Sequence, residues 1–92
     1  MNTVSVKTAS LANLESLAVL FNQYRQFYEQ NSDLALATEF IHQRLQNAES
    51  VILLAEDIQG KALGFCQLYP TFCSVEAKPI YSLYDLFVLP EH

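Results

Sequence analysis

The fold is decided by residues 80–92, which read IYSLYDLFVLPEH. Aromatic and β-branched residues dominate this stretch, and such residues favour β-strands. Because proline cannot donate to a sheet ladder, Pro90 predicts the end of the strand. Both faces are largely apolar, which predicts a strand near the middle of a sheet with helices packed on it. The period of two predicts that one face carries Tyr81, Leu83, Asp85, Phe87 and Leu89.

Two amphipathic helices are predicted in the first half of the chain. Apolar residues recur at three- and four-residue spacings in residues 14–28 and again in residues 34–45. Asn13, with Ser10 as the alternative, is expected to cap the first helix. Asp33 or Ser32 is expected to cap the second.

Short strands flank these helices. Residues 4–7 alternate apolar and polar, which predicts a first strand with one buried face. Residues 51–55, VILLA, are continuously apolar and predict a strand covered on both faces. Gly60 favours a turn into an antiparallel strand over residues 62–69, which Pro70 is expected to end, leaving 71–79 as a loop. The order β-α-α-β-β-β predicts an α+β fold, with two helices on a mainly antiparallel sheet.

Composition excludes several functional classes. The chain has 92 residues, a net charge of −5 and 51% hydrophobic residues, which predicts one acidic globular domain. The negative field argues against a nucleic-acid or anionic-membrane partner. The first residues lack a signal-peptide pattern and no apolar run is long enough to span a bilayer, so we expect a cytoplasmic location. The two cysteines are expected to be thiols. No histidines or cysteines stand at metal-ligand spacing, so no metal site is expected.

Residues 85–92, DLFVLPEH, resemble the fourth strand and following turn of the GNAT acyl-CoA N-acetyltransferases. The resemblance implies that residues 1–92 form a single partial acetyltransferase domain, the N-terminal half of a GNAT fold. In that family an Arg/Gln-x-x-Gly-x-Gly/Ala loop comes next and cradles the pyrophosphate of acetyl-CoA. This motif is not among the 92 residues, so the cofactor-binding C-terminal half is expected to be missing. Further similarity to one bacterial branch lies in residues 24–28, 32–34, 49–52 and 64–70.

The resemblance implies transfer of an acetyl group from acetyl-CoA to a primary amine of a small-molecule acceptor. It also implies that backbone groups of Leu86, Phe87, Val88 and Leu89 pair with the pantetheine arm of the cofactor, as an added strand would. Without the pyrophosphate loop, the chain alone is expected to be inactive.

Asp85 is the candidate catalytic residue, because a carboxylate can bind an amine or accept its proton. The alternative for Asp85 is a purely structural hydrogen bond. Aromatic residues are candidates for the wall of an acceptor site, where they would suit a cationic amine, with ordinary core packing as the alternative. These candidates are Phe27, Tyr28, Tyr69 and Tyr84.

Two other functions stay open. The chain could be a truncated, catalytically inactive module whose apolar residues 80–89 pair with another copy, giving a homodimer or a strand-exchanged oligomer. It could also be a small ligand-binding α+β domain unrelated to acetyl transfer. The coding sequence after His92 would discriminate, since a glycine-rich phosphate loop there favours the enzyme.

Overall fold

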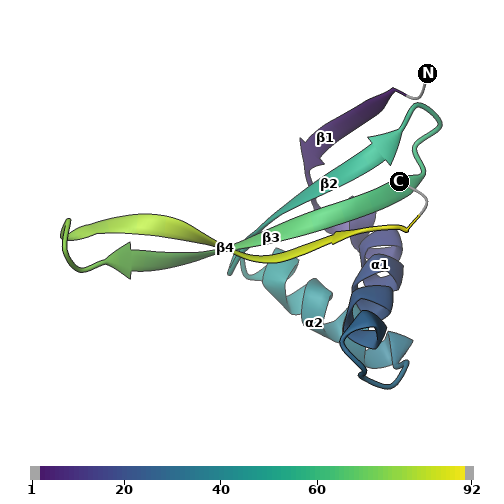
Figure 1. Ribbon diagram of the computed structural model, residues 1–92, viewed down its shortest axis with the longest axis horizontal. Coiled ribbons are helices and arrows are strands. Elements are labelled where there is room, and N and C mark those ends of the chain that lie inside the picture. Colours follow the sequence, from purple (N-terminus) through teal and green to yellow (C-terminus); the bar gives the residue numbers. More distant parts are fainter. Residues whose placement is uncertain (1–2, 91–92) are drawn as a thin grey trace.

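The computed structural model describes residues 3–90, which form a four-stranded antiparallel sheet with two helices (Figure 1). The strands lie in the order β1-β2-β3-β4, so each pairs with its neighbour in the sequence of strands. This confirms the predicted α+β class and element order. The elements are β1 (Val4–Thr8), a short 3-10 helix (Leu11–Asn13), α1 (Leu14–Phe27), α2 (Leu34–Gln46), β2 (Val51–Asp57), β3 (Ala62–Cys73) and β4 (Lys78–Val88).

Side-chain hydrogen bonds define where the helices begin. The Asp33 carboxylate accepts a hydrogen bond from the backbone N–H of Leu36 at 3.0 Å, so Asp33 rather than Ser32 caps α2. Asn22 in α1 accepts from the Asp33 backbone N–H at 2.9 Å, which ties the start of α2 to α1. Asn13 stands at the N-cap of α1, but its side chain accepts from the backbone N–H of Ser10 at 3.0 Å.

The core lies between the two helices and one face of the sheet. The ring of Phe21 in α1 stacks on Phe40 of α2, with 5.2 Å between centroids, and meets Phe65 of β3 edge-on. Along β2 the burial alternates, with Ile52 and Leu54 fully buried against the helices. The buried cluster consists of Leu17, Leu20, Phe21, Ala37, Ile41, Ile52, Leu54 and Phe65.

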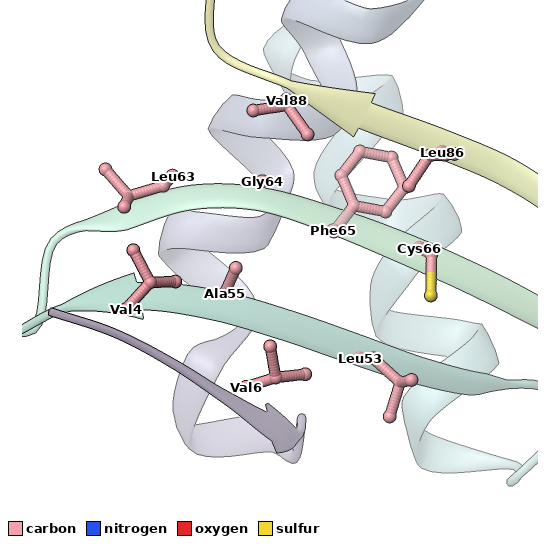
Figure 2. A pocket seen from close by; sticks show the side chains of 10 residues that line it. All are labelled: Val4, Val6, Leu53, Ala55, Leu63, Gly64, Phe65, Cys66, Leu86 and Val88. Carbon is pink, nitrogen blue, oxygen red and sulfur yellow. The ribbon is translucent and has the colours of Figure 1, made fainter. Parts of the chain in front are cut away.

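Within the described residues only one face of the sheet is covered. Both helices lie on the same side, so Leu53 and Ala55 in β2 are partly exposed on the other side (Figures 1 and 2). Coverage of both faces of residues 51–55 was therefore a wrong prediction for this part of the chain. A continuous apolar run does not reveal which of its faces a helix will cover, because that depends on where the helices dock.

The expectation that residues 80–89 lie mid-sheet with both faces covered was also wrong within residues 3–90. β4 is an edge strand and pairs only with β3. Its register also shifts, because Gln67 faces Asp85 whereas Leu68 faces Leu83, so Tyr84 is the extra residue of a β-bulge. The bulge reverses the alternation, and Leu83, which is 58% exposed, does not share a face with Asp85.

β3 and β4 continue beyond the rest of the sheet as a two-stranded ribbon, which projects sideways in Figure 1. Pairing runs from Gly64 as far as Cys73 opposite Lys78, so the predicted loop over residues 71–79 was wrong. β3 tolerates Pro70 because the last β3 residue paired with β2 is Leu68. The ribbon makes the molecule elongated, with a radius of gyration of 14.0 Å, whereas a compact chain of this length has about 12 Å.

In the described part of the chain, no helix has the length and apolar character needed to cross a membrane.

Candidate active site

A chain of hydrogen bonds ends on the carboxylate of Asp85, which is buried at 8% exposure. The hydroxyl of Tyr24 in α1 donates to Asp85 Oδ1 at 2.8 Å. The side-chain amide of Gln67 in β3 donates to Asp85 Oδ2 at 3.0 Å. Ser50, just before β2, donates to the amide oxygen of Gln67 at 2.8 Å. Both carboxylate oxygens are therefore held in place by donors from two other elements.

The alternation along β3 and its pairing with β4 explain why Gln67 meets Asp85. Gln67 follows Leu63 and Phe65 at the period of two, so its side chain lies on the face of β3 that the helices bury. The pairing of Gln67 with Asp85 comes directly before the bulge at Tyr84. Sequence reasoning did not select Gln67 or Ser50. The available signal was a polar residue on an apolar strand face, because a buried amide needs a polar partner.

Two tyrosines near Asp85 are partly removed from water and sense its negative charge. Burial raises the pKa of Tyr24, and its hydrogen bond to Asp85 raises it further. Burial also raises the pKa of Tyr69, followed by the negative charge of Asp85, while Arg44 acts in the opposite direction. Two tyrosine hydroxyls thus experience the same carboxylate, one through a hydrogen bond and one through the field.

The predicted aromatic wall is only partly gathered around Asp85. The ring of Tyr28 lies edge-on to Tyr24, with 5.3 Å between centroids. Tyr69 and Tyr84 form a second edge-on pair at 5.5 Å. Phe27 contacts Tyr28 at 5.2 Å and is 72% exposed, so it lies one ring further from the carboxylate.

The backbone N–H and C=O groups of residues 86–89 point alternately toward β3 and toward the free edge of the sheet. The N–H of Leu89 donates to the carbonyl oxygen of Leu63 at 2.9 Å. Because antiparallel pairing alternates, Phe87 also faces β3, while the N–H and C=O groups of Leu86 and Val88 point to the outer edge. No other strand of the described residues pairs there. Such an edge fits the amide groups of a pantetheine arm.

An apolar hollow of about 280 Å³ lies on the opposite face of the sheet, away from the helices (Figure 2). Charged residues are absent from its lining, and its most reactive group is the thiol of Cys66. The candidate chemistry is therefore on the helix-covered face at Asp85. Among residues 3–90, no three His, Cys, Asp or Glu side chains gather in a way that could hold a metal ion. The hollow is lined by Val4, Val6, Leu53, Ala55, Leu63, Gly64, Phe65, Cys66, Leu86 and Val88.

The sequence of the chain is similar to those of acetyltransferases. The chain is 53% identical over 87 residues to the uncharacterized N-acetyltransferase YhfO of Bacillus subtilis, an alignment that covers 95% of the chain and 58% of that protein. It is 38% identical over 80 residues to a probable acetyltransferase of Haemophilus influenzae, covering 87% of the chain and 54% of that protein. No family model matches.

Solved structures agree. The crystal structure of a probable acetyltransferase matches with a TM-score of 0.90 and 42% identity, over 96% of this chain and 59% of the other. The aminoglycoside N-acetyltransferase AAC(6')-Iy, solved with CoA, shares the fold with a TM-score of 0.80 at 19% identity, over all of this chain and 59% of the other. The chain thus spans a little over half the length of the curated relatives it matches. From its fold and these relatives, the chain belongs to the GNAT acetyltransferases as part of one such domain.

Proposed function

We propose that the protein to which this chain belongs is a cytoplasmic enzyme that transfers an acetyl group from acetyl-CoA to a primary amine. One observation carries the proposal. The buried carboxylate of Asp85 is followed directly along β4 by Leu86 and Val88, whose backbone groups face a free edge. A group suited to an amine therefore lies beside groups suited to the carrier of the acetyl thioester. The similarity to N-acetyltransferases over most of the chain supports this assignment.

The free edge of β4 would hold the cofactor. Amide groups of a pantetheine arm need both donors and acceptors, and the outer N–H and C=O groups of Leu86 and Val88 offer both. Phe87 and Leu89 hold the same segment against β3 and the core. Acetyl-CoA, when bound, supplies an activated thioester carbonyl. A backbone N–H at this edge would stabilise the negative charge that develops on the carbonyl oxygen.

Asp85 would act on the acceptor. An amine attacks only in its neutral form, so a proton must leave near neutral pH. The Asp85 carboxylate would accept a hydrogen bond from the amine and take up that proton. Tyr24 and Gln67 keep the carboxylate in one orientation. Tyr28, Tyr69 and Tyr84 would form the inner wall of the acceptor site, with Phe27 at its outer margin.

An acetylation assay on the whole protein tests the proposal. With a panel of primary amines, we expect release of CoA thiol that depends on the amine. Asp85→Asn should reduce the rate by roughly 10²–10⁴-fold, the range of general acid–base contributions. Full activity of Asp85→Asn, or thiol release unchanged by amines, would contradict the proposal.

A calorimetric titration of acetyl-CoA into the 92-residue chain tests whether this part of the protein binds the cofactor by itself. The chain contains no glycine-rich phosphate loop, so we expect no saturable heat and no acetyl transfer by the chain alone. Saturable binding would mean that the edge at Leu86 and Val88 suffices, and the expected inactivity would be wrong.

Self-association is a second candidate property of this chain. The outer edge of β4 is unpaired within residues 3–90, and residues 80–89 include exposed Tyr81, Leu83 and Leu86. An unpaired apolar edge is a template for another strand. For the 92-residue chain without a cofactor at this edge, we propose a homodimer in which two copies of β4 meet in a self-complementary contact.

A further inference from the structure

Asp85 is a buried carboxylate for which the described residues supply no cation. The ion pairs in this part of the chain are Lys7–Glu56, Arg44–Glu49 and Lys78–Glu76, and none includes Asp85. Its two hydrogen bonds come from neutral donors. Burying a carboxylate is costly unless a positive charge accompanies it. The site therefore has an unbalanced negative charge that a ligand cation would neutralise.

Aromatic rings flank this charge on two sides. Tyr24, with Tyr28 beyond it, approaches from α1. Tyr69 and Tyr84 approach from the sheet, where the bulge places Tyr84 and Asp85 side by side opposite Gln67. Tyr84 is 73% exposed, so its ring is accessible from solvent. The negative faces of such rings attract organic cations.

Among the described residues, a basic side chain whose charge reaches this site is already engaged with other groups. Arg44 is the cation whose charge acts on Tyr69. Its guanidinium already donates to Glu49 at 3.0 Å and lies 4.3 Å from the centre of the Phe40 ring. A ligand carboxylate next to the amine would therefore be repelled by the negative charge of Asp85, and Arg44 would not be free to pair with it.

We propose that Asp85, with the rings of Tyr69 and Tyr84, binds a primary ammonium group on an uncharged carbon skeleton and rejects α-amino acids. Taking this ligand as the acetyl acceptor rests on the function proposed above, whereas the binding itself does not. The class includes arylalkylamines and aliphatic polyamines. They share the ammonium group, which would lie against the carboxylate, and a carbon chain, which would lie on the rings.

The matched probes are 2-phenylethylamine and phenylalanine, which differ by one carboxylate, with 1,4-diaminobutane as the aliphatic member of the class. Each is titrated into the isotope-labelled 92-residue chain without acetyl-CoA and followed by nuclear magnetic resonance. We expect saturable shifts at Tyr24, Tyr69, Tyr84 and Asp85 with at least one of the two amines. Phenylalanine should bind at least roughly 10-fold more weakly. Equal affinity for phenylalanine, or no saturable shift with either amine, would overturn the proposal.

Variants locate the contact. Asp85→Asn should abolish saturable binding. Because that change also disturbs a buried network, Tyr84→Leu is the second variant, and it should weaken binding roughly 3–10-fold through loss of a cation–π contact. Tyr81→Leu, at another exposed tyrosine of β4, should leave affinity unchanged and serves as the control. An unaltered affinity in Tyr84→Leu would refute the role of the rings.

Amine binding at Asp85 and acetyl transfer by the whole protein can be refuted independently of each other. If the amine binds the chain but the whole protein acetylates no amine, the site stands and the proposed enzymatic function falls. If the whole protein acetylates phenylalanine as well as 2-phenylethylamine, the enzymatic function stands and the site proposal falls.

Discussion

Gln67 and Asp85 are cross-strand partners whose side chains are joined by a hydrogen bond of 3.0 Å at the point where the register of β3 and β4 shifts. Gln67 is completely buried, and its other amide atom accepts from Ser50. One side chain therefore connects the bulge to the start of β2.

Replacing Gln67 by leucine should destabilise the fold. The change removes the donor to Asp85 Oδ2 and leaves part of a buried carboxylate without a partner, at a cost of about 1–3 kcal/mol. Urea unfolding followed by circular dichroism measures the loss. Gln59→Leu, in the exposed turn after β2, is the matched control and should change stability by less than about 0.5 kcal/mol. Equal stability of the two variants would show that the network contributes little.

Tyr24→Phe isolates the hydroxyl that donates to Asp85 Oδ1. The ring contacts with Phe65 and Phe87 are retained, so the expected loss of about 1–2 kcal/mol comes from the hydrogen bond. Tyr28→Phe, at a position 60% exposed, is the control and should be close to neutral. The same unfolding measurement applies, and a neutral Tyr24→Phe would contradict the importance of this bond.

Stability should fall at high pH. The folded state raises the pKa of Tyr24, first by burial and then through Asp85, so it holds the phenolic proton more tightly than the unfolded chain does. Below pH of about 10 both states are protonated and the contribution is constant. Above that value the unfolded chain loses the proton first, and the stability declines as pH rises.

An ultraviolet titration of the five tyrosines checks this sign. Tyr24 and Tyr69, whose pKa values are both raised, should ionise late in the titration. Tyr24→Phe should remove part of the late phase. A late phase that Tyr24→Phe leaves unchanged would contradict the raised pKa of Tyr24.

Gly64→Ala should push β3 and β4 apart beside the proposed cofactor edge. An added Cβ would lie 2.6 Å from the carbonyl oxygen of Phe87 and 3.1 Å from Val88 Cα, both backbone atoms. We expect a loss of about 1–3 kcal/mol in unfolding free energy, with weaker acetyl-CoA binding by the whole protein. Gly60→Ala is the control, since its added Cβ meets no atom within 4 Å and only the backbone angle φ of +83° is strained, at about 1 kcal/mol. The control should bind acetyl-CoA normally.

Leu83→Lys should weaken self-association through β4. Leu83 is 58% exposed, so the lysine is tolerated in the monomer, but its charge opposes close contact of two edges. Sedimentation velocity over a concentration series measures the effect. Ile58→Lys, at an exposed turn residue, adds the same charge away from β4 and should leave association unchanged. A monomer at every concentration in the unmodified chain would exclude the proposed dimer.

Local patterns determined most of the elements of this protein. The spacing of apolar residues in α1 and α2, and the Asp33 cap, follow from contacts within a few residues, so they could be predicted from the sequence. The antiparallel hairpin of β2 and β3 followed from the turn at Gly60. Asp85 was recognisable because it is a single carboxylate inside an apolar strand.

Tertiary structure decided which faces are covered and what surrounds Asp85. Three features depend on which segments pack beside each other: the helices cover one face of the sheet, β4 is an edge strand, and β3 continues past Pro70. The periodicity of the sequence carries no information about such contacts. The bulge at Tyr84 reversed the alternation that the sequence suggested. Tyr24 and Asp85 are 61 residues apart in the chain. Their hydrogen bond forms because α1 packs on the same face of the sheet on which the side chain of Asp85 lies.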